Sequence, residues 1–201
     1  MNNKKTLAII LAVVAVVAII ALVVGMNMNA NKDSAPNNNQ SNSSVNPASE
    51  FSPQALDQLA YVATTKTVVG GQTVTGTTES DGKGTVKTST TVAGQKNETY
   101  VKGNEVTVCV DGMCTKSTVD TSTQNSGSTA PDFSQYKATA KNEGTADCPA
   151  GTCQVWKASG PLGNVTYYID SQNRVSKTVV GDGTFEASYE YKDVTVTVPA
   201  A

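Results

Sequence analysis

Residues 163–199 read GNVTYYIDSQNRVSKTVVGDGTFEASYEYKDVTVTVP, and this stretch decides the fold. It divides into four runs, 163–170, 174–180, 185–192 and 194–199, in which large side chains alternate with polar ones. Such alternation indicates antiparallel strands with one packed face and one solvated face. Pro199 lacks an N–H and is predicted to end the fourth strand. The predicted packed sets are Val165, Tyr167 and Ile169; Val175 and Val179; Phe185, Ala187, Tyr189 and Tyr191; and Val194, Val196 and Val198.

The chain before this stretch continues the same texture from about residue 67, with short Thr- and Val-rich runs between turn signals. This spacing predicts an antiparallel β meander. The pattern is weak only over 118–147, where a short helix or lid segment is expected at 131–136. The turn signals are Asp81-Gly82, Ala93-Gly94, Gly103-Asn104, Asp111-Gly112, Ala150-Gly151, Gly163-Asn164, Gln172-Asn173 and Asp182-Gly183.

One longer helix is predicted ahead of the meander, over residues 53–63. Ser52 suits the N-cap and Pro53 the first helical position. Phe51 and Leu56 have the spacing of a hydrophobic staple. A stripe at helical spacing is expected to pack this helix on the sheet; it consists of Leu56, Leu59, Ala60 and Ala63.

The segment Leu7–Val24, LAIILAVVAVVAIIALVV, is unbroken apolar sequence. As a helix it would span about 27 Å, close to the hydrocarbon thickness of a bilayer. Lys4 and Lys5 precede it, and the positive-inside rule then keeps the N-terminus in the cytoplasm. The sequence therefore predicts a transmembrane anchor over 7–25. A cleaved signal peptide, with weak sites such as the one at 23–25, and a buried helix of a soluble domain are the alternatives.

The anchor divides the chain into four parts. Residues 1–6 are expected in the cytoplasm, and 26–49, rich in Asn, Ser and Pro, form a linker that is predicted to be disordered. Residues 50–201 make one exported β-rich domain, so the protein is expected to be a single-pass protein of the cell membrane. With Lys4 and Lys5 left inside, the exported part holds 13 of the 15 basic residues and all 17 acidic residues, a net charge of −4. This balance gives no reason to expect a nucleic-acid partner.

The four cysteines form two C-x4-C pairs, Cys109 with Cys114 and Cys148 with Cys153. A type I′ turn at Asp111-Gly112 would place the first pair opposite each other, with Cα atoms about 4.5 Å apart, within reach of a disulfide. The second pair permits the same geometry, or a longer turn begun by Pro149. Local disulfides are therefore predicted. Free thiols and a four-cysteine zinc site are the alternatives. The zinc site is weak, because the spacing is not C-x2-C, histidine is absent and the exported side is oxidising.

The absence of histidine excludes a Ser-His-Asp or Cys-His arrangement. No catalytic residue, cofactor or metal is predicted, and an enzyme is not expected. Arg174, the single arginine, is interpreted as a surface charge at a turn. Aromatic residues gather in the C-terminal strands, either as core or as the lining of an apolar ligand site. The candidate ligand residues are Trp156, Tyr167, Phe185, Tyr189 and Tyr191.

The C-terminal series 153–157, 165–170, 174–177 and 190–199 resembles the end of the LolA/LppX-like family of periplasmic or cell-surface lipoprotein and lipid carriers. The resemblance implies a curved half-barrel sheet that holds acyl chains on its concave face. Together with the residue patterns, it predicts a mainly antiparallel α+β fold. The expected architecture is a curved meander or half-barrel with one packed N-terminal helix, preceded by a single transmembrane helix.

Two functions follow as expectations. The first is a membrane-anchored extracytoplasmic binding domain whose hydrophobic ligand is a lipid or a lipoprotein acyl chain. The second is a surface structural or interaction module that binds a protein or a glycan and takes no small-molecule ligand.

Overall fold

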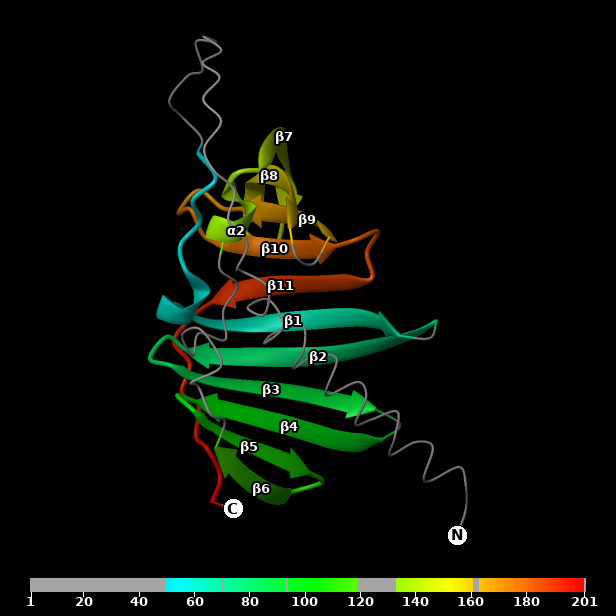
Figure 1. The fold of residues 1–201 in the computed structure, drawn as a ribbon, viewed down its shortest axis with the longest axis vertical. Coiled ribbons are helices and arrows are strands. Elements are labelled where there is room, and N and C mark those ends of the chain that lie inside the picture. Colours follow the sequence, from blue (N-terminus) through cyan, green and yellow to red (C-terminus); the bar gives the residue numbers. More distant parts are fainter. Residues whose placement is uncertain (1–49, 70, 93, 119–132, 161–162, 201) are drawn as a thin grey trace, which may run out of the picture.

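A single eleven-stranded antiparallel sheet makes up most of the described protein (Figure 1). The structure is a computed structural model, and it describes residues 50–69, 71–92, 94–118, 133–160 and 163–200. The strands are β1 (Ala60–Val69), β2 (Gln72–Asp81), β3 (Thr85–Val92), β4 (Gln95–Lys102), β5 (Glu105–Val110), β6 (Met113–Thr118), β7 (Lys141–Cys148), β8 (Gly151–Gly160), β9 (Gly163–Ile169), β10 (Val175–Val180) and β11 (Phe185–Tyr191).

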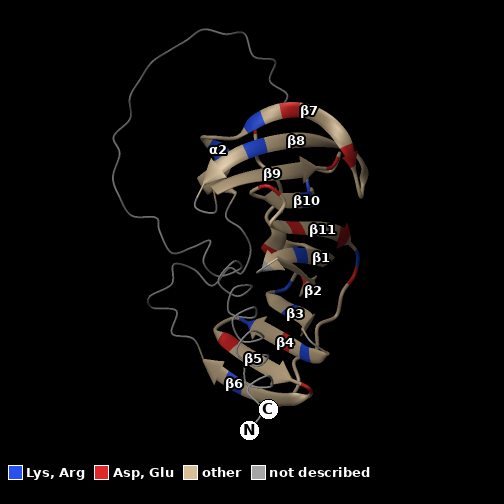
Figure 2. Ribbon diagram, turned by 90° about the vertical axis from the view of Figure 1, so that its right-hand side faces the viewer, with Lys and Arg blue, Asp and Glu red and all other residues tan. Residues whose placement is uncertain are grey.

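The strand order β6-β5-β4-β3-β2-β1-β11-β10-β9-β8-β7 is two meanders joined in the middle. The chain runs outward from β1 to the β6 edge, restarts at the β7 edge, and returns inward until β11 pairs with β1. Figure 2 shows the sheet curved, with the short helix α2 (Ser134–Lys137) on its concave side. The predicted mainly antiparallel β fold is confirmed, and α2 confirms the short helix expected near residue 136.

The membrane-related predictions fall outside this part of the chain. The cytoplasmic terminus 1–6, the anchor 7–25 and the linker 26–49 all precede the first described residue. Among the residues that the structure does describe, no helix is long and apolar enough to cross a bilayer. The anchor therefore stays a prediction from the sequence.

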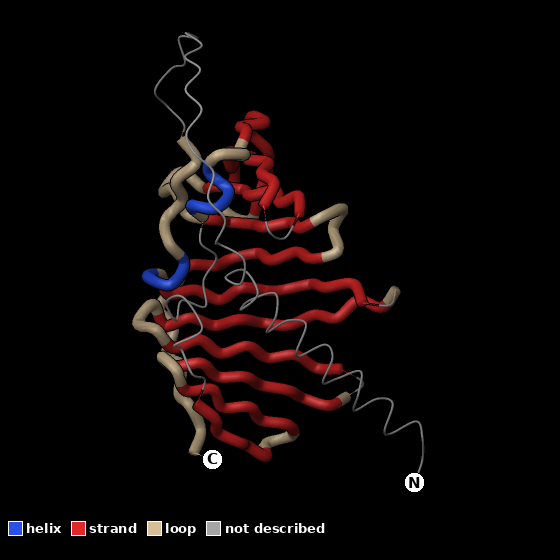
Figure 3. The backbone as a smooth tube through the Cα atoms, in the orientation of Figure 1, coloured by secondary structure: helices blue, strands red, loops and turns tan. Residues whose placement is uncertain are grey.

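The prediction of a packed N-terminal helix over 53–63 is wrong. A single 3-10 turn, η2 (Leu56–Gln58), forms there, and β1 begins at Ala60, so that little of the described chain is helical (Figure 3). The β-branched run that follows Tyr61 favours a strand, and β1 gains ladder partners on both sides in β2 and β11. These pairings outweigh the weak helical stripe.

The segment before β1 is held by the turn between β9 and β10 instead of by a helix cap. The Gln54 N–H donates to the carbonyl of Asn173 at 2.9 Å, and the Asn173 side-chain amide donates to the carbonyl of Ser52 at 2.6 Å. Phe51 and Leu56 are both buried, so the expected staple residues do pack inward, although no longer helix joins them.

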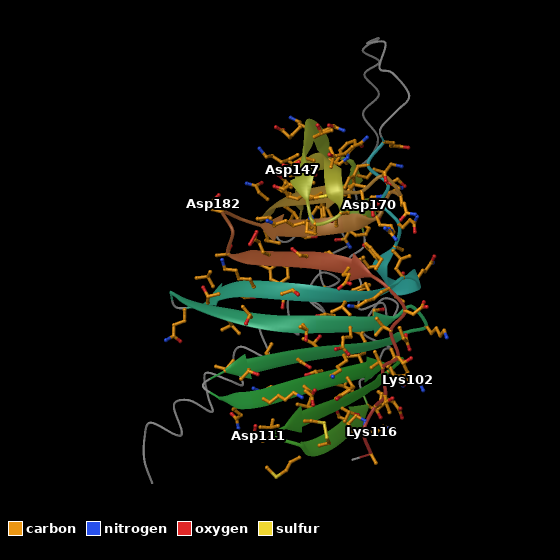
Figure 4. All side chains as sticks on the ribbon, turned by 180° about the vertical axis from the view of Figure 1, so that it is seen from behind. Lys102, Asp111, Lys116, Asp147, Asp170 and Asp182 are labelled. Atoms are coloured by element: carbon orange, nitrogen blue, oxygen red, sulfur yellow. A yellow bond between two sulfur atoms is a disulfide. The ribbon has the colours of Figure 1, made fainter. Side chains whose placement is uncertain are left out.

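The prediction of a fourth C-terminal strand over 194–199 is also wrong. Residues 192–200 form no strand and run past the ends of the strands on the β2–β6 side of the sheet (Figures 1 and 4). The reason lies in the topology: the edge of β11 that a following strand would use is taken by β1. The alternation survives in weaker form, with Val194, Val196 and Val198 half-buried and the threonines between them exposed.

A β-bulge changes the predicted packing of β10. Val175 pairs with Ile169, but Lys177 pairs with Tyr168, so Ser176 is an extra residue. The bulge shifts the alternation by one position. Val180, and not Val179, therefore joins Val175 in the core.

The core lies on the concave side, over the half of the sheet from β1 to β8. It contains one large cluster of buried apolar residues that joins the sheet to η2 and α2. Its members are Phe51, Leu56, Tyr61, Ala63, Phe133, Tyr136, Trp156, Ala158, Val165, Tyr167, Ile169, Val175 and Val180.

Candidate functional site

The ladder register assigns each strand residue to one face of the sheet, because residues directly opposite each other point to the same side. Tyr61 belongs to the core and lies opposite Ser80 of β2. Continuing outward, Ser80 lies opposite Val86, Val86 opposite Val101, and Val101 opposite Val106. This row therefore marks the concave face all the way to β5.

On β2 to β6, every residue that shares this face is uncharged. The charged residues of these strands all take the alternate positions and lie on the convex face, where Figure 4 shows Lys102 and Lys116. Successive residues of a strand point to opposite faces, and no described strand from β2 to β6 changes register by a bulge. The charged residues of these strands are therefore completely separated from the concave face.

Ion pairs link the convex charges across the strands. The Lys87 amine lies 3.3 Å from a Glu98 carboxylate oxygen and 3.8 Å from one of Glu79, and Lys96 lies 3.0 Å from Glu98. Partial burial opposes ionisation of Glu98, but hydrogen bonds from Lys96 and Lys87 outweigh it and lower the pKa of this carboxyl. Lys116 pairs with Glu105 at 2.7 Å. These cations are thus engaged with carboxylates on the convex side.

Among the rows of side chains that cross the strands on the concave face of β2 to β6, two lie next to each other. The first is apolar and half-buried, and consists of Val86, Val101 and Val106. The second is mostly hydroxyl-bearing, and consists of Thr78, Thr88, Thr99, Val108 and Thr115. Members of the two rows are two residues apart along each strand, about 6.7 Å. This surface is the candidate site.

The hydroxyl row is partly ordered by its own hydrogen bonding. The hydroxyl oxygens of Thr78 and Thr88 lie 3.4 Å apart, so one donates to the other. A hydroxyl both donates and accepts, so each keeps capacity for a further partner. The row can therefore offer hydrogen bonds to a neutral polar group without placing a charge beside the valines.

The predicted aromatic ligand residues lie in or against the core beside this surface. Trp156 and Tyr167 are buried, and Phe185, Tyr189 and Tyr191 are half-buried against the same cluster. Their role in ligand binding stays a prediction.

The space next to Trp156 and Tyr167 is filled by Phe51 from the N-terminal segment. The Phe51 ring centroid lies 5.2 Å from that of Tyr167 and 5.6 Å from that of Trp156. Phe133 and Tyr136 add edge contacts to Tyr167, each at 5.6 Å. Desolvation raises the pKa of the Tyr167 phenol above its ordinary value, which suits a packed site more than a solvated one.

Arg174 was wrongly interpreted as a surface charge. Its guanidinium donates twice to one carboxylate oxygen of the buried Asp170, from Nε at 2.9 Å and from the terminal nitrogen at 2.8 Å. The other carboxylate oxygen accepts the backbone N–H groups of Gln172 and Arg174. The guanidinium also lies over the Tyr191 ring at 4.3 Å. The Asp-x-x-x-Arg spacing around a turn was the available signal.

Both predicted disulfides are present, which excludes the zinc alternative for these cysteines. Cys109 lies directly opposite Cys114, with Cα atoms 4.0 Å apart, and Asp111 and Gly112 both have positive φ as a type I′ turn requires. In the second hairpin Cys148 lies opposite Gly151, so the bond to Cys153 is diagonal and spans 5.9 Å between Cα atoms.

Fold and site together define an open antiparallel β-sheet domain with an aromatic core on one half of its concave side and an uncharged Val/Thr surface on the other. No family model matches the chain, and no curated protein matches it.

The solved structures to which this chain is similar include two distant ones. One is an uncharacterized conserved protein from Thermus thermophilus, with a TM-score of 0.47 and 13% identity over 69% of this chain and 82% of that chain. The other is PNGF-II, with a TM-score of 0.32 and 14% identity over 70% of this chain and 29% of that chain. Both scores are below 0.5, so neither likeness enters the functional argument.

Proposed function

We propose that residues 50–200 form an extracytoplasmic binding domain that takes the acyl chain of a lipid or lipoprotein on the concave face of β2 to β6. The predicted anchor 7–25 would hold this domain at the membrane from which the ligand comes. The resemblance of the C-terminal strands to lipid carriers of the LolA/LppX-like family supports the same reading.

The observation that carries the proposal is the separation of charge between the two faces. Every charged residue of β2 to β6 lies on the convex face, and the concave face keeps half-buried valines beside threonines. A strand face that contacts only water does not require its charged residues to be confined to the opposite face. An acyl chain laid on the valine row would gain about 0.8 kcal/mol for each methylene that it buries.

An interaction module without a small-molecule ligand is the second candidate. The filled aromatic half favours it, since Phe51 occupies the position next to Trp156 and Tyr167 where a ligand ring or chain would otherwise lie. The two candidates differ in what they expect of the Val/Thr surface: only the first requires an apolar molecule to be bound there.

Photo-crosslinking distinguishes them. The full-length protein is reconstituted in phosphatidylcholine vesicles that contain a 1-acylglycerol with a diazirine in its chain, and label is quantified in peptides from residues 72–118. The wild-type protein is expected to be labelled there. Val108→Lys places an unpaired charge on the concave face and should reduce the label about tenfold or more.

Val62→Lys is the matched control. Val62 is also a half-buried strand valine, but it lies on the convex face opposite Glu79 of β2 and Glu190 of β11. It should keep wild-type labelling, and Trp156 fluorescence verifies that both variants fold. Equal labelling of the two variants, or no label in the wild type, would contradict the carrier function.

A further inference from the structure

We infer that the ligand of the concave face is an uncharged acyl ester, with a glycerol-like or sugar-like head, and that anionic lipids are excluded. This inference rests on the proposed function and goes further by naming the chemical class of the ligand. It follows from which groups the concave face offers to a head group and which it lacks.

None of the cationic side chains of the described strands β2 to β6 lies on the concave face, where it could pair with a phosphate or carboxylate. The lysines of these strands all lie on the convex face by their register, where Lys87, Lys96 and Lys116 have glutamate partners. The sheet itself separates these amines from the concave surface. An anion taken from water onto half-buried valines would therefore lose its hydration without gaining a counter-charge.

Neutral hydroxyl and ester groups, by contrast, find partners on the second row. The threonine hydroxyls at Thr78 and Thr88 lie 3.4 Å apart, and Thr115 is an exposed member of the same row on β6. Within this pair, the hydroxyl that accepts can still donate to an ester carbonyl, and the hydroxyl that donates can still accept from a head-group hydroxyl. Hydrogen bonds between neutral groups need no compensating charge, so this row matches a neutral head group.

The two rows also fix the direction of the ligand. The valine row crosses β3, β4 and β5 and continues to Ser80 on β2 and Ser117 on β6, four strand spacings or about 19 Å. The hydroxyl row runs beside it. The acyl chain thus lies across the strands on the valines, and its ester and hydroxyl groups face the threonines.

The test compares two probes that share one diazirine-bearing acyl chain: a 1-acylglycerol and the corresponding 1-acylglycerol-3-phosphate. Each is added to phosphatidylcholine vesicles that hold the full-length protein, and label in peptides from residues 72–118 is normalised to the probe content of the vesicles. The neutral probe is expected to give about tenfold more label than the phosphate. Equal or greater labelling by the phosphate would overturn the inference while leaving the carrier function in place.

The Val108→Lys variant tests whether an added cation on the concave face allows the phosphate probe to bind. Val108 lies in the hydroxyl row between Thr99 and Thr115, so the introduced amine would stand where the phosphate must lie. This variant should reverse the preference and label more with the phosphate than with the neutral probe. An unchanged preference would overturn the inference. If neither probe labels the wild type or the variant, the proposed function itself fails.

Discussion

Replacing Phe51 by alanine tests whether the N-terminal segment is an integral part of the domain. The Phe51 side chain is 4% exposed and lies against Trp156, Tyr167 and Phe133 at centroid distances of 5.2–6.2 Å. A buried phenylalanine removes at least 150 Å² from water, worth about 4 kcal/mol at 25 cal/mol per Å². The free energy of unfolding should therefore fall by about 3–5 kcal/mol.

The assay is urea unfolding of the full-length protein in nanodiscs, followed by tryptophan fluorescence. Trp156 is the only tryptophan, and its ring centroid is 5.6 Å from that of Phe51, so the probe reports on the substituted site. Removing Phe51 should also shift the folded-state emission to longer wavelength, because water gains access to the indole.

Phe185→Ala is the matched control. Phe185 is half-buried on β11, three strands or about 14 Å from β8 and Trp156. It should lower stability by less than Phe51→Ala and leave the folded-state emission unchanged. A loss below about 1 kcal/mol for Phe51→Ala, with unchanged emission, would show that the segment before β1 is not packed against the aromatic cluster.

Three further outcomes are expected. Asp170→Asn should lower the free energy of unfolding in urea by about 2–3 kcal/mol, because it weakens the double contact with Arg174. Asp182→Asn, at an exposed turn, is the control and should leave the free energy of unfolding almost unchanged. Equal losses for the two variants would contradict the role given to Asp170. Replacing Cys109 and Cys114 together by serine should cost about 2 kcal/mol, the chain-entropy value for so short a loop, and an unchanged urea midpoint would argue against it. Burial raises the pKa of the phenol in Tyr61, Tyr167, Tyr189 and Tyr191. The stability contributed by these neutral phenols is therefore fully present below the unfolded-state pKa near 10 and is lost as the pH rises above that value. Absorbance at 295 nm should show the phenols ionising only when the protein unfolds, and their titration in the folded protein would refute this.

Local signals in the sequence predicted the local structure well. The Asp111-Gly112 turn fixed a two-residue hairpin and with it the Cys109–Cys114 pairing, because a type I′ turn leaves one register. The alternation of Val165, Tyr167 and Ile169 identified the packed face of β9, because alternate residues of a strand point to the same face. In each case the residues that determine the outcome are close neighbours in the chain.

The failures all depend on distant parts of the chain. The segment 60–63 has a helical stripe, but pairing of β1 with β11, more than a hundred residues away, makes it a strand. The run 194–198 alternates like a strand, yet β1 already holds the edge that it would need. Likewise, the bulge at Ser176 depends on how β10 meets β9. None of these constraints can be read from a local window.

The candidate site was missed for a related reason. Within each of the strands β2 to β6, the charged residues share one set of alternate positions and the other set is uncharged, which is visible in the sequence. That all five charged faces point the same way emerges only when the register aligns them. The sequence directed attention to the aromatic residues, which the structure places in or against the core.

The most direct test of the account is the location of the crosslink on the wild-type protein. With the neutral diazirine probe in vesicles, tandem mass spectrometry should place adducts on concave residues of β3 to β5, namely Val86, Thr99, Val101, Val106 or Val108. Adducts confined to convex residues such as Lys87 and Tyr100, or to residues before 50, would contradict a ligand surface on the concave face.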